Sequence, residues 1–437
     1  MRAFDVRPYL NAVKSAETVL LKGKITKIVG LVIESDGPSI NLGELCYISP
    51  RIEAPLLPAE VVGFRENRVL LMPLGEMQGI GPGSEVVSSR NLLRVKVGQA
   101  LLGRVLDGLG NPIDGKGPLL ADIEYPIQSP PPAPLSRRRI CEPVSVGIRA
   151  VDGLMTLGKG QRMAILAGSG VGKSTMMGMI ARNTSADINV IALIGERGRE
   201  VLDFIERDLG EEGLKKSVVV VSTSDQPALL RIKGANTATA VAEYFRDQGL
   251  DVMLMMDSLT RVAMAQREVG LTIGEPPATR GYPPSVFAMM PKLLERSGTG
   301  EKGSITGLYA VLVDGDDMNE PVADNVRSIV DGHVVLSRRL AAQNHYPPID
   351  ILSSLSRVMN EVVDAEHLKA AQRLRSLQAT YQEAEDLINI GAYSAGSNPE
   401  IDRAIERNPG IRDFLRQGVM EKVSFADTVA RMKQLVQ

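Results

Sequence analysis

A glycine-rich loop between a short apolar strand and a helix constrains this sequence more than any other feature. The loop follows the apolar run Arg162–Leu166 and precedes a helical pattern that continues to Ala181. Its residues are Ala167, Gly168, Ser169, Gly170, Val171, Gly172, Lys173 and Ser174, with Thr175 next. Glycines let successive backbone N–H groups turn toward a phosphate, and a helix N-terminus adds its positive dipole end. The sequence therefore predicts a nucleotide-binding phosphate loop.

Two side chains of this loop carry chemistry of their own. Lys173 is placed to reach the β- and γ-phosphates of ATP, and the Ser174 hydroxyl is placed to ligate Mg²⁺. The usual pattern begins with glycine, whereas this chain has Ala167 there. Because alanine still permits a tight turn, the match indicates a working loop rather than a glycine-rich turn with a chance lysine.

Composition narrows the class of protein. The chain has 437 residues, 44% of them hydrophobic and 23% charged, which is typical of a globular protein of two to four domains. A formal net charge of −2, no Trp and only 4% aromatic residues argue against a protein that binds nucleic acid.

Cysteine usage and hydropathy predict a compartment. Cys46 and Cys141 are the only cysteines and lack metal-ligand spacing, which favours a reducing compartment. No uncharged apolar stretch approaches the roughly 20 residues that span a bilayer, and no signal-peptide core begins the chain. We expect a cytoplasmic protein that meets the inner face of a membrane through partners.

The first half of the chain is predicted to hold a helix, a small β-barrel and a connector. Residues 1–17 have helical spacing and either dock on their own protein or bind a partner. Residues 18–92 alternate in short runs broken by turn signals, which predicts an oligomerisation barrel. Its expected strands are Gly23–Val32, Pro38–Leu42, Val61–Phe64, Val69–Pro73 and Glu85–Val87.

A connector is expected over residues 93–150. It includes an extended proline passage at Pro126–Leu135, with little helix or strand, and a basic triplet at Arg137–Arg139. Such a triplet usually belongs to a solvated segment.

Beyond the connector, apolar runs alternate with helical patterns to about residue 350. Expected strands are Ile188–Ile194, Ser217–Ser222, Val252–Met256 and Ile305–Val313. Such runs indicate a mostly parallel sheet covered on both faces, a RecA-like α/β core that binds ligands at the carboxyl ends of its strands. With the connector, this core forms a predicted ATPase domain over residues 93–358.

Residues 359–437 are predicted to be a helical domain. Apolar residues recur there in alternating steps of four and three residues, a pattern typical of a coiled-coil seam: Ala370, Leu374, Leu377, Tyr381, Ala384 and Ile388. Such a seam is more often part of the intramolecular core than a groove that binds a partner. Gly391 is a plausible C-cap, Asn398 and Ser424 are expected to begin two further helices, and Asn408–Gly410 is expected to be a break.

Other charged residues complete the predicted site. Asp257 ends an apolar strand and is placed to hold Mg²⁺ through its water shell, opposite Ser174. Glu196 follows a second core strand and is the candidate group that polarises the attacking water. Three arginines at the same edge are candidates to neutralise charge on the phosphoryl group, with surface ion pairs as the alternative reading: Arg197, Arg199 and Arg261.

Five ordered motifs resemble a known family. AGSGVGKST, IGERGREV, MMDSLTR, EPPATRGYPPSVF and HYPPIDILSSLSR resemble the ATPases of type III secretion systems, most nearly the flagellum-specific branch, which are similar to the catalytic β subunit of rotary F-type ATPases. The resemblance runs from about residue 20 to the C-terminus. It is weakest in the first 17 and last 60 residues.

The resemblance implies a homohexamer with nucleotide sites between subunits. By its motif match, Glu196 is expected to be the catalytic glutamate and Arg197 a phosphate contact. Arg357 is expected to be an arginine finger that reaches a neighbour's γ-phosphate, and Tyr346 to stack on adenine, unless it is only a buried aromatic near a turn. Implied cofactors are ATP and Mg²⁺.

The resemblance also implies partners. The N-terminal helix would bind the regulator and stalk protein of the flagellar ATPase. The C-terminal helices would meet the central coiled-coil stalk protein and export chaperones with their substrates, and an export gate at the membrane would be reached through partners.

Four functions therefore stay open. An ATPase that energises flagellar protein export is favoured over the nearest rival, a virulence-type injectisome ATPase with the same site chemistry. A hexameric nucleic-acid translocase is disfavoured by charge and aromatic content. A non-catalytic ring subunit is disfavoured because Glu196 and Arg357 are both present.

Overall fold

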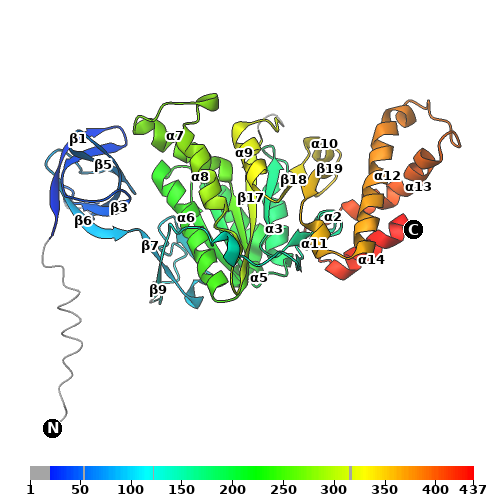
Figure 1. The fold of residues 1–437 in the computed structure, drawn as a ribbon, viewed down its shortest axis with the longest axis horizontal. Coiled ribbons are helices and arrows are strands. Elements are labelled where there is room, and N and C mark those ends of the chain that lie inside the picture. Colours follow the sequence, from blue (N-terminus) through cyan, green and yellow to red (C-terminus); the bar gives the residue numbers. More distant parts are fainter. Residues whose placement is uncertain (1–19, 53–54, 122, 314–316) are drawn as a thin grey trace, which may run out of the picture. The chain divides into compact units, whose positions relative to one another are not determined.

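The computed structural model describes residues 20–52, 55–121, 123–313 and 317–437 (Figure 1). The predicted helix within residues 1–17 lies outside this part of the chain. Two compact units divide at Leu93 and Arg94, and the first also takes in Thr272–Gly274. In the described part, no helix has the length and apolar character that crossing a membrane requires.

The first unit contains a closed antiparallel barrel, which confirms the predicted barrel. Around the barrel the order is β1-β2-β5-β4-β3-β6. Bounds are Lys22–Val29 (β1), Val32–Asp36 (β2), Glu44–Ile48 (β3), Leu57–Arg65 (β4), Arg68–Pro73 (β5) and Glu85–Leu92 (β6). Alternate residues point inward, so that Ile25, Ile33, Ile48, Leu71 and Val86 form the barrel core.

Two strand predictions in this segment are wrong. The run Gly23–Val32 is a hairpin rather than one strand, because Gly30 turns the chain with a φ of 57°. The run Pro38–Leu42 is a loop. Its Pro38 has no N–H to donate, and the Asn41 N–H is bound by the Glu44 side chain at 2.9 Å instead of by a neighbouring strand.

The second unit is built on a nine-stranded sheet within the described residues, with the order β19-β18-β12-β17-β15-β13-β14-β8 and β16 beside β17. β19 and β16 are antiparallel to their neighbours and the other pairs are parallel. Bounds are Val105–Asp107 (β8), Arg162–Ala167 (β12), Ile188–Ile194 (β13), Ser217–Ser222 (β14), Asp251–Asp257 (β15), Gly298–Thr299 (β16), Ser304–Leu312 (β17), Gly332–Leu336 (β18) and Ile349–Ser356 (β19). The predicted α/β core is confirmed.

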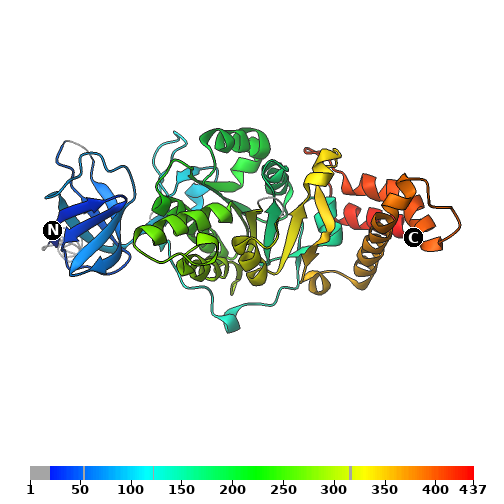
Figure 2. The same ribbon diagram turned by 90° about the horizontal axis from the view of Figure 1, so that it is seen from above.

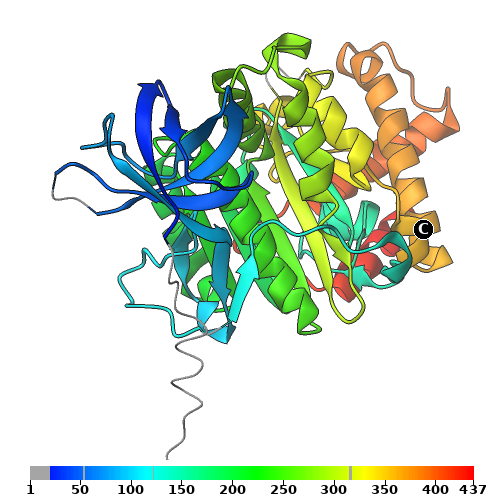
Figure 3. The ribbon, with the colours of Figure 1, turned by 60° about the vertical axis from the view of Figure 1, so that its left-hand side comes forward.

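Helices cover this sheet, and Figure 3 shows the long helix α6 lying along it. Helix bounds are Arg149–Leu154 (α2), Lys173–Asn183 (α3), Gly198–Asp203 (α4), Gly210–Lys215 (α5), Ala228–Asp247 (α6), Leu259–Thr272 (α7), Pro284–Leu294 (α8), Pro321–Ile329 (α9), Arg338–Ala342 (α10) and Met359–Val362 (α11). A π-helical turn, Phe204–Leu209, joins α4 to α5. Sheet residues such as Ile165 and Leu193 are fully or almost fully buried between the helical layers.

The connector is more structured than the sequence predicts. It contributes β8 to the sheet, and two of its strands pair with each other, Arg94–Val97 (β7) and Ile123–Pro126 (β9). Short elements complete it: η1 (Gln99–Leu101), η2 (Pro134–Ser136) and β10 (Pro143–Val144), which pairs with β11 (Leu157–Gly158).

The prediction that the basic triplet is a solvated segment is confirmed for Arg138 and Arg139, which are exposed, and wrong for Arg137, which is partly buried. Arg137 donates to the carbonyl of Ser297 at 2.9 Å, and Arg138 donates to the carbonyls of Gly300 and Lys302 at 3.1 and 2.8 Å. The turn between α8 and β17 leaves these backbone oxygens without a strand partner, and the two guanidinium groups satisfy them.

The C-terminal helices share a core with the sheet. They are Ala365–Asn389 (α12), Pro399–Leu415 (α13) and Phe425–Val436 (α14), gathered at the β19 side of the sheet in Figure 2. Leu374 and Phe414 belong to the same buried cluster as Ile165. The apolar seam of α12 is therefore intramolecular core, as predicted.

The predicted caps of these helices are confirmed. Side chains of Asn398 and Ser424 cap α13 and α14, and Gly391 follows α12 with a φ of 71°. The predicted break at Asn408–Gly410 is wrong, because α13 continues through it. Pro409 removes a single helical hydrogen bond, and burial of the helix face that carries Ile411 outweighs this loss.

Candidate active site

The phosphate loop joins β12 to α3 at the carboxyl end of the sheet. β12 ends at Ala167, and α3 begins at Lys173. Gly172 caps α3 in a left-handed conformation with a φ of 98°, and Gly170 has a φ of 76°. Because such angles are costly for other residues, the two glycines make this turn possible and leave the N-terminal N–H groups of α3 facing the loop.

A distant arginine packs on the loop. A Cβ on Gly168 would lie 2.6 Å from Nε of Arg338, so a larger residue there would displace the arginine side chain. Arg338 begins α10, beyond β18. Nothing in the sequence pattern singled out this residue.

Lys173 and Asp257 form an ion pair below the loop. Their side chains are only 11% and 4% exposed. Asp257 ends β15, as predicted, and Lys173 begins α3. The Asp257 carboxylate therefore balances the charge of the Lys173 ammonium.

Glu196 stands where β13 ends. Gly195 precedes it with a φ of 74°, and a Cβ there would lie 2.7 Å from Cβ of Arg261, so that only glycine permits this close approach. The Glu196 carbonyl accepts the Ser224 N–H at 3.0 Å, which holds the turn against the residues that follow β14.

The carboxyl group of Glu196 is held in an environment that favours its protonated form. Burial raises the pKa of Glu196 to about 7, assisted by the nearby Asp257 carboxylate and by a hydrogen bond to Glu200. The same hydrogen bond lowers the pKa of Glu200. Glu200 lies four residues after Glu196 and was not among the residues that the sequence pattern singled out.

These groups surround one cavity of about 450 Å³. Its lining includes the predicted residues Gly168, Ser169, Gly170, Gly172, Lys173, Ser174, Thr175, Glu196, Arg197 and Arg261, together with Gly195, Glu200, Ser224 and Leu312. Ala167 and Val171 are buried and are not part of the lining. Arg199 does not line the cavity either, because its guanidinium is exposed beside Asp203.

Tyr346 lies next to the loop outside this lining. Its Cε1 atom is 3.9 Å from the position that a Cβ on Gly172 would take, and the residue is 45% exposed. Its carbonyl accepts the Gln417 N–H at 2.9 Å. The exposed ring beside the phosphate loop excludes the alternative of a fully buried aromatic.

Arg357 lies at the far end of the same sheet. It follows β19, and the preceding residue, Ser356, pairs with Gly332 at the start of β18. Its backbone N–H donates to the Asp331 carbonyl at 2.9 Å. The side chain is exposed and forms no ion pair with any residue that the structure describes. The structure therefore does not bring Arg357 to the cavity of its own chain.

The donor set suits a magnesium nucleotide. Ser174 offers an exposed hydroxyl in the cavity, and Asp257 offers a carboxylate close behind Lys173. No group of three or more possible metal-binding side chains occurs in the described ranges. This is the pattern of Mg²⁺ sites that use one or two protein oxygens and rely on water and phosphate for the rest.

Comparison with known protein families matches most of the chain. Residues 147–356 match the nucleotide-binding domain of the ATP synthase alpha/beta family, and residues 25–90 match its β-barrel domain. Residues 363–434 match the C-terminal domain of the type III secretion ATPase EscN.

Individual relatives align along almost their full length. The flagellum-specific ATP synthase of Bacillus subtilis is 54% identical, with 98% of each chain covered. The type 3 secretion system ATPase of Xanthomonas euvesicatoria is also 54% identical, over 93% of this chain and 92% of the relative.

A solved structure has the same fold. The assembled ATPase EscN from the enteropathogenic E. coli type III secretion system aligns with a TM-score of 0.90 and 48% identity, covering 95% of this chain and all of that one. EscN has also been solved in complex with its central stalk EscO, with a TM-score of 0.88, 47% identity and the same coverage. This chain therefore belongs to the ATP synthase alpha/beta family, in the group of flagellum-specific ATP synthases and type 3 secretion system ATPases.

Proposed function

We propose that this protein hydrolyses ATP at the subunit interfaces of a homohexamer and thereby energises the export of flagellar proteins through a type III secretion apparatus. One observation carries the proposal. The phosphate loop and Glu196 line one cavity, whereas Arg357 lies at the opposite end of the sheet. A second subunit is therefore needed to bring Arg357 to the γ-phosphate.

Within the cavity, each residue has a separate task. Backbone N–H groups of the loop and the Lys173 ammonium bind the phosphates of ATP. Mg²⁺ would be held by the Ser174 hydroxyl and, through water, by Asp257, and it would neutralise phosphate charge. Glu196 orients the attacking water and accepts its proton. Arg197, 82% exposed at the cavity wall and 3.8 Å from the Glu200 carboxylate, would exchange this ion pair for the phosphates.

Two groups act outside the cavity. Tyr346 provides a flat apolar surface for adenine beside the loop. Arg357 of one subunit stabilises the negative charge that develops on the phosphoryl group bound to its neighbour. Assembly and hydrolysis would thereby be linked, because Arg357 of a chain does not reach that chain's own cavity.

The partners follow from the relatives. The stalk complex of EscN supports a central stalk partner. This partner would bind at the C-terminal helices, as would export chaperones with their substrates. Residues 1–17 would bind a regulator and stalk protein. The hexamer would act on the cytoplasmic side of the membrane, joined to the export gate by partners.

The flagellar role is favoured over that of an injectisome. A relative named as flagellum-specific aligns over 98% of this chain, and one named as a type 3 secretion system ATPase aligns over 93% at equal identity. Deletion of the gene should abolish flagellar filaments. Filaments that persist while effector secretion is lost would favour the injectisome.

The first test is the ATPase rate per chain as a function of protein concentration, for wild type and Glu196→Gln. We expect the wild-type rate to rise with concentration as subunits assemble, and the variant to be almost inactive at every concentration. A wild-type rate that is independent of concentration, in a protein that sizing shows to be monomeric, would contradict hydrolysis at an interface.

A further inference from the structure

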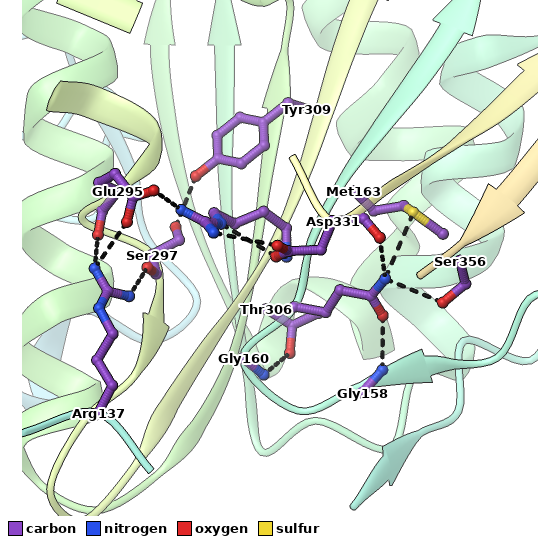
Figure 4. A network of polar contacts seen from close by, with 12 residues as sticks. Arg137, Gly158, Gly160, Met163, Glu295, Ser297, Thr306, Tyr309, Asp331 and Ser356 are labelled. Atoms are coloured by element: carbon purple, nitrogen blue, oxygen red, sulfur yellow. Dashed lines mark hydrogen bonds and ion pairs between the residues drawn. The ribbon is translucent and has the colours of Figure 1, made fainter. Parts of the chain in front are cut away.

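A buried glutamine stands at the start of the strand that ends in the phosphate loop. Gln161 immediately precedes β12 and is fully buried. Its Oε1 accepts the Gly158 N–H at 2.9 Å. Its Nε2 donates to the Asp331 carbonyl at 3.2 Å and to the Ser356 Oγ at 3.1 Å. The amide therefore joins β12 to the residues that flank β18 and β19 (Figure 4).

Both acceptors of this amide belong to the immediate support of Arg357. The Asp331 carbonyl that Gln161 contacts also accepts the Arg357 N–H at 2.9 Å. Ser356 precedes Arg357, and its hydroxyl donates in turn to the Thr156 carbonyl at 3.0 Å. Nε2 of Gln161 therefore contacts the Asp331 carbonyl and the Ser356 hydroxyl, the two groups that hold the backbone at the end of β19, just before Arg357.

Asp331 is itself held firmly. Its carboxylate accepts the Arg162 backbone N–H at 3.0 Å and Nε at 3.2 Å, and its own N–H donates to the Arg162 carbonyl at 2.9 Å. The Arg162 guanidinium also pairs with Glu295. A Cβ on Gly332 would lie 2.3 Å from the Leu355 carbonyl, so β18 and β19 approach closely at this point. The network has little freedom to shift as a whole.

We propose that Gln161 is a positioning residue for Arg357, and that it sets the rate of hydrolysis at the neighbouring subunit's site without affecting nucleotide binding at its own. The inference rests on the proposed role of Arg357. Gln161 lies far from the phosphate loop of its own chain, because the six residues of β12 separate the two by roughly 20 Å at about 3.3 Å per residue. Loss of the amide therefore leaves the chain's own cavity untouched.

The two ends of β12 serve different parts of the protein. β12 carries the phosphate loop at one end and the support of Arg357 at the other, and it is hydrogen bonded to β17 and β18 along its length. A substitution of Gln161 therefore alters only the end of the strand that supports Arg357.

The test uses the full-length chain with Gln161→Leu and, as a milder change, Ser356→Ala. We expect kcat to fall by roughly 10-fold to 100-fold in Gln161→Leu and by less in Ser356→Ala, with unchanged affinity for a fluorescent ATP analogue. Thr306→Val is the matched control. Its buried hydroxyl accepts the Gly160 N–H at 2.9 Å in the same network but does not contact Asp331 or Ser356, so kcat should be unchanged.

An experiment that mixes two variants distinguishes a displaced Arg357 side chain from a chain that fails to fold. Gln161→Leu chains keep an intact cavity, and Glu196→Gln chains keep an intact Arg357. A mixture should therefore be more active per chain than either variant alone, as should a mixture of Arg357→Ala with Glu196→Gln. A chain that failed to fold would not be rescued.

The outcomes distinguish two failures. If the Arg357→Ala mixture regains activity but Gln161→Leu keeps the wild-type kcat, or is not rescued in its mixture, the positioning role of Gln161 is wrong and the proposed function stands. If the Arg357→Ala mixture gains nothing, the site is not shared between subunits, and the proposed mechanism fails together with this inference.

Discussion

Tyr346 and Arg357 lie at opposite ends of the same strand, β19. Tyr346 is three residues before the strand and 3.9 Å from the position of a Cβ on Gly172, whereas Arg357 follows it beside Asp331. The strand has eight residues, so its two ends are separated by roughly 25 Å at about 3.3 Å per residue. Under the proposed function, β19 would therefore serve two different nucleotides, one beside Tyr346 and one on the neighbouring subunit beside Arg357.

The first prediction concerns Arg357. Replacing it by Ala should lower kcat by roughly 10³-fold to 10⁵-fold, because the charge that develops on the phosphoryl group loses its trans partner. Arg357→Lys should recover only part of the rate, since an ammonium lacks the planar fork of donors. Steady-state kinetics at saturating ATP measure the effect, and sizing of the variant controls for lost assembly. Wild-type kcat in an assembled Arg357→Ala protein would contradict the role.

The second prediction concerns Tyr346. Tyr346→Ala should weaken ATP binding by about tenfold, because stacking of a base on an aromatic ring contributes about 1–3 kcal/mol. Tyr346→Phe should retain the affinity, since the ring and not the hydroxyl makes the contact. Calorimetry with tripolyphosphate, which has no base, provides the control and should give equal affinities for all three proteins. A parallel loss of tripolyphosphate binding would mean that the substitution distorts the phosphate loop instead.

The third prediction concerns the pH dependence of hydrolysis. Burial raises the pKa of Glu196 to about 7, and a protonated carboxyl cannot accept a proton from water. Because kcat/KM reports the free enzyme, it should fall by about tenfold per pH unit below about pH 7. Glu200 helps to raise this pKa, so Glu200→Gln should move the acid limb to lower pH. An acid limb that stays in place in Glu200→Gln would exclude Glu196 as the titrating group.

The fourth prediction concerns stability at low pH. His345 is 5% exposed, and burial together with Arg416 and Arg412 lowers its pKa from 6.5 to about 4. Its Nε2 has no hydrogen-bond partner within the described ranges. The cavity beside it, about 160 Å³, is also lined by other charged groups, Arg339, Asp350 and Glu385.

In the folded protein His345 is neutral, whereas the unfolded chain binds a proton below about pH 6.5. The free energy of unfolding should therefore fall as the pH decreases from 6.5 to 4, by roughly 2–4 kcal/mol from this residue. His345→Gln should lose this part of the pH dependence. Denaturant titrations of both proteins at about pH 7.5 and pH 4.5 measure the difference, and equal slopes in the two proteins would show that His345 does not titrate.

Much of the architecture was predictable because local patterns decide it. Largely apolar runs of six or seven residues, such as Ile188–Ile194, become central parallel strands, and capping residues such as Asn398 begin helices. Local patterns failed where a tertiary contact outweighed them. Pro409 lies inside a helix because the helix face around it is buried. Arg137 is partly buried because its guanidinium donates a hydrogen bond to the Ser297 carbonyl.

The sequence by itself determined the phosphate loop, the order of the domains and the residue types of the site, because spacing and side-chain chemistry within short segments are sufficient for these. Only the tertiary structure decided which groups meet. It pairs Lys173 with Asp257, raises the pKa of Glu196 by burial and places Arg338 on Gly168. It also places Arg357 far from the phosphate-loop cavity of the same chain, because β19 runs antiparallel to β18 and ends at the opposite end of the sheet.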